Sequence, residues 1–218
     1  MLYIVSTPIW NLEDITMRAL RILSEVDIVV CEDTRKTATL LNHYQIKKPL
    51  LSYHSHSGTM KVDKIIDELK LGKTIAQVSD AGTPWISDPG YKLIELALEN
   101  NIKVTPIPWV SAFLTCLQGS GLPINHFTYL WFLPIKKGRQ TMLKKLAQKE
   151  ETVVIYESVH RIIKTLRELK NTLWWNHKVV IWRELTKKFE EIWRGSFDDA
   201  EIYFANKEKQ KGEFVLVF

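Results

Sequence analysis

The chain has 218 residues, of which 45% are hydrophobic and 25% are charged, with a formal net charge of +5. This size and composition are typical of one large or two small globular domains, and they exclude a disordered, collagen-like or disulfide-rich chain. The mild positive balance permits a nucleic acid or another anionic partner without requiring one.

The first half of the chain alternates short apolar runs with helical patterns of apolar residues. The five runs that predict strands are residues 2–5, 27–31, 49–52, 74–78 and 103–107. Helical spacing predicts helices after Asp14, over 37–43, 61–71 and 91–99, and from Ser111 onward. This alternation predicts the α/β fold class, with a mostly parallel sheet covered by helices on both faces.

A stretch rich in Gly, Pro, Ser and Asn at residues 119–126 predicts a domain boundary. We therefore predict an N-terminal α/β domain over 1–119 and a C-terminal α/β domain over 120–218. In the second domain the predicted strands are residues 127–133, 152–156, 178–182 and 212–218. The predicted helices are residues 139–147, 161–169 and 197–205.

The loop at residues 79–90, SDAGTPWISDPG, is longer than a simple turn between a strand and a helix requires. Its Gly, Pro and Asp residues allow backbone conformations that an ordinary loop cannot adopt. Polar clusters also follow three other strands, at residues 7–8, 32–35 and 111–112. Because the carboxyl ends of parallel strands meet at one edge of a sheet, these clusters predict a small-molecule pocket rather than four separate turns.

Several common sites are absent from the sequence. There is no Walker A loop and no G-x-G-x-x-G fingerprint, which argues against a nucleotide hydrolase and a standard NAD enzyme. No serine has the context of a nucleophile elbow. Neither the two cysteines nor the six histidines have the spacing of a metal site, so we expect no metal and no disulfide. The chain opens on a strand without a basic leader or a membrane-spanning run, which predicts a cytoplasmic protein with no membrane partner.

Basic residues cluster near several predicted strand ends. Taken singly, each is best explained as a surface charge in contact with water. Together at one edge, they suggest that a polyanion lies over the pocket. The candidate residues for this contact are Arg35, Lys36, His54, Lys137, Arg139, Arg161, Arg183 and Lys187.

Eight motifs occur in order along the chain: VSTPIxNLEDIT, EDTR, LSYHxH, SDAGTPxISDPG, IPxVSA, FLP…KK, YESxHRI and RELTKKFEE. In this order they resemble the bacterial 16S ribosomal RNA cytidine-2′-O-methyltransferases, a branch of the tetrapyrrole-methylase superfamily. The resemblance implies two α/β domains, the C-terminal one smaller and with a mixed sheet, a cofactor cleft between them, and a homodimer. It also implies S-adenosylmethionine as cofactor and 2′-O-methylation of a cytidine ribose in the 16S RNA of the small ribosomal subunit, so that the polyanion is RNA.

The same resemblance assigns roles to single residues. It implies cofactor contacts at Ile9, Asp80, Ala81, Gly82, Thr83, Pro84, Ile86, Ser111, Ala112 and Leu133. The implied reaction is a direct displacement, in which a ribose 2′-hydroxyl attacks the methyl group on the cofactor's sulfonium. Glu32, Asp33 and Glu157 are candidate bases for the hydroxyl proton, although each could instead only orient Arg35 or Arg161.

Tryptophan stands where the family has glycine at Trp10, Trp109 and Trp131. Nine glycines in 218 residues is about 4%, below the usual ~7%, while the chain has eight tryptophans. Glycine at such turns permits a positive φ or a close approach of the backbone to a ligand. We therefore predict that some or all of the tryptophans are UGA codons that the source organism reads as glycine, and UGG codons at these three positions would contradict this. The full set is Trp10, Trp85, Trp109, Trp131, Trp174, Trp175, Trp182 and Trp193.

Two alternatives to an RNA methyltransferase stay open. One keeps the fold and changes the substrate to a tetrapyrrole precursor or a diphthine-type substrate, although the basic clusters favour RNA. The other is a non-catalytic RNA-binding protein, if the tryptophans are genuine and obstruct the cofactor pocket. Many family members also have a C-terminal extension, and we expect no RNA contact from such a segment because this chain ends at its closing strand.

Overall fold

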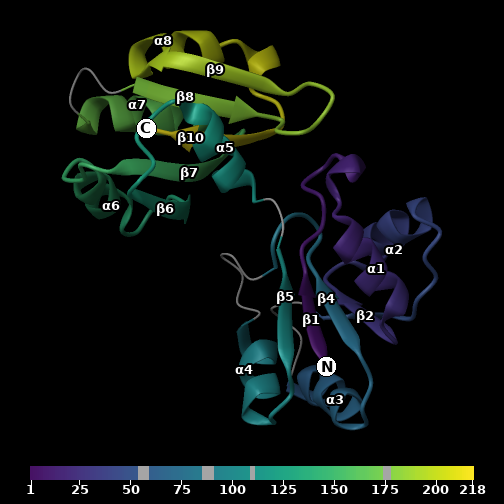
Figure 1. Cartoon of the computed structure of the whole chain (residues 1–218). Coiled ribbons are helices and arrows are strands. Elements are labelled where there is room, and N and C mark those ends of the chain that lie inside the picture. Colours follow the sequence, from purple (N-terminus) through teal and green to yellow (C-terminus); the bar gives the residue numbers. More distant parts are fainter. Residues whose placement is uncertain (54–58, 85–90, 109–110, 174–177) are drawn as a thin grey trace. The chain divides into compact units, whose positions relative to one another are not determined.

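The computed structural model describes residues 1–53, 59–84, 91–108, 111–173 and 178–218. The chain divides into two compact units, Met1–Ser111 and Ala112–Phe218 (Figure 1). The boundary predicted after residue 119 falls inside helix α5 (Ala112–Ser120). This helix packs on the sheet of the second unit, which is why the division comes before it.

The first unit contains a five-stranded sheet in the order β3-β2-β4-β1-β5, and every strand pair in it is parallel. Its strands are β1 (Leu2–Val5), β2 (Ile28–Cys31), β3 (Leu50–Ser52), β4 (Ile75–Val78) and β5 (Val104–Ile107). The register aligns Leu2 with Ile75 of β4 on one side and with Val104 of β5 on the other. The predicted parallel α/β sheet is therefore confirmed, and the carboxyl ends of all five strands lie at one edge.

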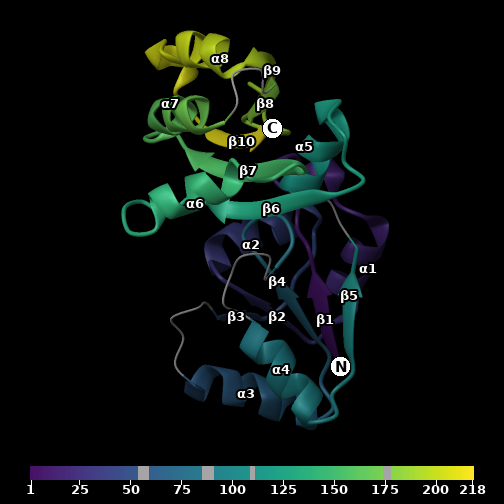
Figure 2. The same ribbon diagram turned by 90° about the vertical axis from the view of Figure 1, so that its left-hand side faces the viewer.

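Helices cover both faces of this sheet, as the pleat of the strands requires. They are α1 (Met17–Glu25), α2 (Thr34–His43), α3 (Thr59–Lys70) and α4 (Tyr91–Glu99). Leu2 and Ile4 of β1 face a core shared with α3 and α4, while Val5 faces a core shared with α1 and α2. Figure 2 shows α3 and α4 beside one another, in agreement with their contact. Helix α1 is capped by the Thr16 hydroxyl rather than by Asp14, which lies in a preceding 3-10 turn, η1 (Leu12–Asp14).

The second unit contains a mixed sheet in the order β6-β7-β10-β8-β9, in which only β6 and β7 pair in parallel. Its strands are β6 (Phe127–Phe132), β7 (Thr152–Ser158), β8 (Lys178–Arg183), β9 (Glu191–Ser196) and β10 (Glu213–Val217). The apolar runs predict no strand at β9, because this edge strand is half-exposed and its first residue continues a charged run. The other four strands lie where the apolar runs predicted them.

Helices α6 (Arg139–Leu146), α7 (Ile162–Thr172) and α8 (Phe197–Phe204) share one apolar core with the sheet of the second unit, and a short 3-10 turn, η2 (Lys207–Lys209), follows α8. Leu166 and Leu169 of α7 are fully buried in this core, together with Ile155 of β7. Helix α5 packs on β7 and β10. Helix α6 also contacts α7, so the short connection from β6 leads into a pair of packed helices.

Candidate functional site

Two strand ends of the first unit are tied together by backbone and hydroxyl hydrogen bonds. Thr7, after β1, and Gly82, after β4, exchange backbone hydrogen bonds of 2.9 and 3.0 Å. The Thr7 hydroxyl donates to the Ser79 carbonyl at 3.0 Å, and the Ser79 hydroxyl donates to the Gly82 carbonyl at 2.9 Å. Gly82 has a φ of +78°, and no described atom lies within 4 Å of the position that a Cβ would take. A ligand can therefore approach this backbone closely.

Asp80 joins a third strand end to this loop. One of its carboxylate oxygens accepts a hydrogen bond from the Asp33 backbone N–H at 3.0 Å, just past β2. The other accepts from the Lys36 Nζ at 2.8 Å. The structure thus brings together residues that are more than 40 positions apart in the sequence, as the convergence of parallel strand ends requires.

The Asp33 carboxylate is hydrogen-bonded to its neighbour Arg35. Its carboxylate caps α2 by accepting the Arg35 backbone N–H at 2.9 Å, and it accepts from the Arg35 guanidinium at 3.0 and 2.7 Å. These hydrogen bonds, first from the side chain and then from the backbone, hold the pKa of Asp33 well below its usual range. The Arg35 side chain is still 88% exposed, so its charge is displayed at the surface.

The other proposed cofactor contacts of the first unit lie near the same edge. Ile9, Pro84 and Ser111 are buried, Thr83 is half-buried and Ala81 is exposed. Ala112 begins α5 and belongs to the second unit. Ile86 and His54 lie outside the described residues.

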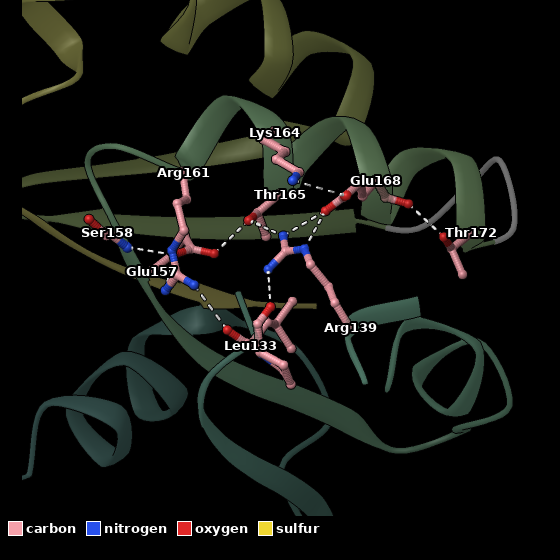
Figure 3. A network of polar contacts seen from close by, with 10 residues as sticks. Leu133, Arg139, Glu157, Ser158, Arg161, Lys164, Thr165, Glu168 and Thr172 are labelled. Atoms are coloured by element: carbon pink, nitrogen blue, oxygen red, sulfur yellow. Dashed lines mark hydrogen bonds and ion pairs between the residues drawn. The ribbon is translucent and has the colours of Figure 1, made fainter. Parts of the chain in front are cut away.

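Leu133, the candidate contact in the second unit, follows β6 directly. The whole residue is only 2% exposed and its side chain packs in the core, so a ligand contact at this position would fall on its backbone. Its carbonyl accepts a hydrogen bond from the Arg161 Nη1 at 3.0 Å (Figure 3). The Arg161 Nη2 lies 2.9 Å from a carboxylate oxygen of Glu157, whose side chain is fully buried.

Arg139 lies in the same polar network and is only 3% exposed. Its guanidinium donates to the Pro134 carbonyl at 3.1 Å, to the Thr165 hydroxyl at 2.7 Å and to Glu168 at 2.7 Å. The guanidinium of Arg139, a predicted RNA contact, therefore faces inward in this structure. Its side chain turns inward because the half-buried Glu168 carboxylate, the Thr165 hydroxyl and the Pro134 carbonyl together satisfy the planar fork.

Two more predicted RNA contacts of the second unit are held in ion pairs. The Arg183 side chain is 12% exposed and lies 2.9 Å from Glu191. Lys187 lies 2.9 Å from Glu184 and 3.2 Å from Glu213. Burial alone would raise the pKa of Glu191, but hydrogen bonds from Lys209, Tyr203 and Arg183 lower this pKa to about 2.

Exposed lysines without a described carboxylate partner lie around α6. They are Lys136, Lys137, Lys144 and Lys145. Lys137 is the only one of them among the predicted RNA contacts. The turn before the helix ends at Gly138, whose φ of +82° needs glycine, and no side chain caps the helix there.

Sequence reasoning missed the partners that bury these arginines, namely Thr165, Glu168 and Glu191. Thr165 had a recognisable signal, because it lies one helical turn from Ile162 and Leu169 on the apolar face of α7. A hydroxyl at such a position needs a buried partner. Among the residues that the structure describes, no cluster of His, Cys, Asp and Glu could hold a metal ion, and no helix is long and apolar enough to cross a membrane.

Four of the eight tryptophans are described. Trp10 and Trp131 are 47% and 44% exposed, Trp193 is half-buried, and Trp182 is 6% exposed. None of these four has a positive φ, so at these positions a left-handed backbone is not the reason for glycine. Trp182 packs against Gly119, where an added Cβ would lie 2.5 Å from the indole ring, and its Nε1 has no hydrogen-bond partner among the described atoms. Trp85, Trp109, Trp174 and Trp175 lie outside the described residues.

Comparison with known proteins gives matches over nearly the full length. The family of tetrapyrrole (corrin/porphyrin) methylases matches residues 1–201. A protein from Synechocystis sp. named ribosomal RNA small subunit methyltransferase I is 45% identical over 217 residues, which cover 99% of this chain and 77% of that protein. A protein of the same name from Thermotoga maritima is 44% identical over 216 residues and covers 99% of this chain and 96% of its own length.

Solved structures share the fold at much lower identity. A diphthine synthase superposes with a TM-score of 0.75 at 12% identity, covering 100% of this chain and 89% of that chain. A uroporphyrin-III C-methyltransferase from Thermus thermophilus, complexed with S-adenosyl homocysteine, gives a TM-score of 0.65 at 16% identity and covers 99% and 96%. At these identities the likeness shows the architecture and not the substrate.

Proposed function

Because this chain belongs to the tetrapyrrole (corrin/porphyrin) methylase family of S-adenosylmethionine-dependent methyltransferases, we propose that it methylates a cytidine 2′-hydroxyl in the 16S RNA of the small ribosomal subunit. The observation that supports an RNA substrate is the near full-length identity with proteins named ribosomal RNA small subunit methyltransferase I. The neighbours with tetrapyrrole or diphthine names share only the fold.

The tied strand ends of the first unit suit this cofactor. S-adenosylmethionine has no phosphate, so it needs backbone donors and acceptors and an apolar wall rather than an anion cradle. No described atom lies within 4 Å of the position that a Cβ would take at Gly82, and buried Ile9 lies after the neighbouring strand. When bound, the cofactor supplies an electrophilic methyl group on its sulfonium. We propose that residues 80–84, Ile9 and Ser111 hold it from the first unit, and that Ala112 and the backbone of Leu133 contribute from the second.

Among the three candidate bases, we retain Glu32. Asp33 is a weak proton acceptor because its pKa is lowered by Arg35. The Glu157 carboxylate is buried and accepts from Ser158, Arg161 and Thr165. A general base contributes about 10²–10⁴-fold to rate, so Glu32→Gln should lower kcat by at least ~100-fold and leave KM for the cofactor nearly unchanged. An unchanged kcat would remove Glu32 from this role.

For RNA contacts we propose exposed cations rather than buried ones. Arg35 and Lys36 are 88% and 56% exposed despite their ion pairs, and the α6 lysines are exposed without a described partner. Phe189 is exposed beside Lys188, whose Nζ lies 5.7 Å from the ring centroid. An exposed ring next to a cation suits an unstacked base and its phosphate. On the family resemblance we further propose that the protein is cytoplasmic and forms a homodimer. Light scattering of the purified chain tests the dimer.

The experiment uses methyl-labelled S-adenosylmethionine with small ribosomal subunits that lack the modification. Two forms of the chain are compared, one as printed and one with glycine at all eight tryptophan positions, with free tetrapyrrole precursors and a diphthine-type substrate in parallel. We expect label in RNA, in a dinucleotide that resists alkaline hydrolysis because its 2′-oxygen is methylated. Label in RNA from the glycine form alone would also support the recoding.

Three outcomes contradict parts of this proposal. Label only in a tetrapyrrole or diphthine-type product would replace the substrate. If the label were recovered in mononucleotides after alkaline hydrolysis of the RNA, the methyl group would be on a base rather than on the ribose. Failure of both forms to bind S-adenosylmethionine, measured by calorimetry, would contradict the enzyme function and leave an RNA-binding protein.

A further inference from the structure

Two arginines of the second unit hold two successive backbone carbonyls. Arg161, at the start of α7, donates to the Leu133 carbonyl at 3.0 Å, and Arg139, at the start of α6, donates to the Pro134 carbonyl at 3.1 Å. Both carbonyls lie in the short connection that leaves β6. Figure 3 shows the Arg139 and Arg161 guanidiniums converging on this segment from two different helices.

A carboxylate neutralises each guanidinium, and a buried hydroxyl links the two ion pairs. Arg161 pairs with Glu157 at 2.9 Å, and Arg139 pairs with Glu168 at 2.6 Å. Thr165 joins the two pairs, because its hydroxyl donates to Glu157 at 2.5 Å and accepts from Arg139 at 2.7 Å. A network in which each described member has partners orients its groups strongly.

This arrangement fixes the backbone more tightly than packing alone. The ring of Pro134 sets its own φ. The arginines hold the peptide carbonyls on either side of that ring, so the peptide planes before and after Pro134 are both oriented. The Arg161 guanidinium also lies 5.5 Å from the centre of the Phe132 ring, which restrains the residue before Leu133.

We propose that Arg161 and Arg139 are positioning residues, which fix the backbone of residues 132–134 so that it can receive the cofactor. This inference rests on the proposed function, since Leu133 is a cofactor contact only there. The Leu133 side chain is occupied by the core, so the cofactor can meet only its backbone, and the orientation of that backbone then sets the affinity. The inference replaces the expectation that these two arginines bind RNA phosphates.

The test separates cofactor affinity from stability in the full-length chain. Arg161→Gln removes the hydrogen bond to the Leu133 carbonyl but leaves Glu157 buried without its cation, so the variant is expected to lose stability as well. The double variant Glu157→Gln with Arg161→Gln restores charge neutrality. A glutamine is too short to reach from position 161 to the Leu133 carbonyl, so this carbonyl loses its donor while Arg139 still holds the Pro134 carbonyl.

We expect the double variant to regain most of the lost melting temperature while its Kd for S-adenosylhomocysteine, measured by calorimetry, stays about tenfold above that of the parent chain. Loss of one charged hydrogen bond accounts for this factor. Thr165→Ser keeps the hydroxyl and should bind like the parent chain, whereas Thr165→Val should bind more weakly. Arg167→Gln is the matched control, because Arg167 lies on the same helix, is exposed and pairs with Glu201 of α8.

Parent-like cofactor affinity in the double variant would overturn the inference and leave the network with a purely structural role. A raised KM for RNA with an unchanged cofactor Kd would also overturn it and restore the RNA contact. If the parent chain itself failed to bind the cofactor, the proposed function would fail instead, so the two failures are distinguishable.

Discussion

The two units use the same sequence pattern, a charged cluster after a strand, in opposite ways. After β2, Arg35 and Lys36 pair with carboxylates and still remain 88% and 56% exposed. After β6 and β8 of the second unit, the side chains of Arg139 and Arg183 pair with carboxylates and are only 4% and 12% exposed. The first unit displays its cations, whereas the second encloses most of those that the motifs selected.

The surroundings of each cluster explain this difference. In the first unit the clusters lie at the carboxyl ends of parallel strands, where the ligand is expected, and Arg35 and Lys36 stay largely exposed there. In the second unit α6 and α7 pack against one another, and Arg139 of α6 bonds to Thr165 and Glu168 of α7. Arg183 of β8 instead pairs with Glu191, directly opposite it on the neighbouring strand β9. A buried cation must have carboxylate and carbonyl partners, because an uncompensated buried charge costs several kcal/mol. Basic residues in similar motifs therefore have different roles in the two units.

The largest expected effect is on Arg139. Arg139→Gln removes the cation from a buried network and leaves the Pro134 carbonyl and part of Glu168 without a donor. Breaking a buried pair in this way costs about 3–5 kcal/mol in the free energy of unfolding. The matched variant Arg35→Gln removes an exposed pair and should cost less than about 1 kcal/mol. Urea unfolding measures both, and equal losses would contradict the contrast between the units.

Acid should destabilise the second unit through Glu191. Its pKa is lowered from 4.5 to about 2 in the folded state by Lys209, Tyr203 and Arg183, against the opposing effect of burial. The unfolded chain then binds more protons, so the stabilisation is complete above about pH 4.5 and is lost as the pH falls towards 2. A shift of this size corresponds to at most about 3 kcal/mol at neutral pH, and solvent screening reduces it.

Unfolding of the parent chain and of Glu191→Gln, followed between pH 7 and pH 3, tests this expectation. The variant should be less stable at neutral pH and should lose less stability on acidification. The pH profile of Glu184→Gln is compared with that of Glu191→Gln, because Glu184 lies in the same region and pairs with Lys187. Parallel pH profiles for the parent chain and Glu191→Gln would contradict the role of Glu191.

Much of the architecture follows from the sequence, because apolar runs and helical spacing are local signals. They locate all five strands of the first unit and four of the five in the second. Strand β9 escapes because it is an edge strand without an apolar run. The tied strand ends at Thr7, Asp33 and Asp80 could also be expected, since parallel strands carry their ends to one edge.

The direction of the charged side chains could not be predicted from the sequence. Whether Arg139 faces water or the interior depends on Glu168 and Thr165, which lie 29 and 26 positions away along the chain. Composition near Arg139 resembles that near Lys137, yet one is buried and the other exposed. Burial of a cation is a property of tertiary packing, so it requires the structure.

Substitution of the exposed lysines beside α6 should have an intermediate effect, and it should change the affinity for RNA rather than the stability of the fold. Lys136→Gln with Lys137→Gln should weaken binding to small-subunit RNA by about tenfold at low salt. It should also reduce the slope of log affinity against log salt by about 1.4, since each phosphate contact to a single strand contributes about 0.7. Lys187→Gln, whose cation is committed to Glu184 and Glu213, should leave the slope unchanged. A reduced slope in Lys187→Gln alone would reverse the assignment.

The smallest expected effect concerns the ion pair between Lys36 and Asp80 in the first unit. Its Nζ lies 2.8 Å from the carboxylate and joins two strand ends, but the lysine is 56% exposed. Water and salt screen such a pair, so Lys36→Gln should cost only about 0.5 kcal/mol in 0.1 M salt and almost nothing in 1 M salt. Lys92→Gln is the control, because Lys92 pairs with Glu95 of the same helix, α4, and both side chains are largely exposed. If Lys36→Gln cost several kcal/mol at both salt concentrations, this exposed pair would stabilise the fold as much as the buried pairs of the second unit do. That result would contradict the contrast between the two units.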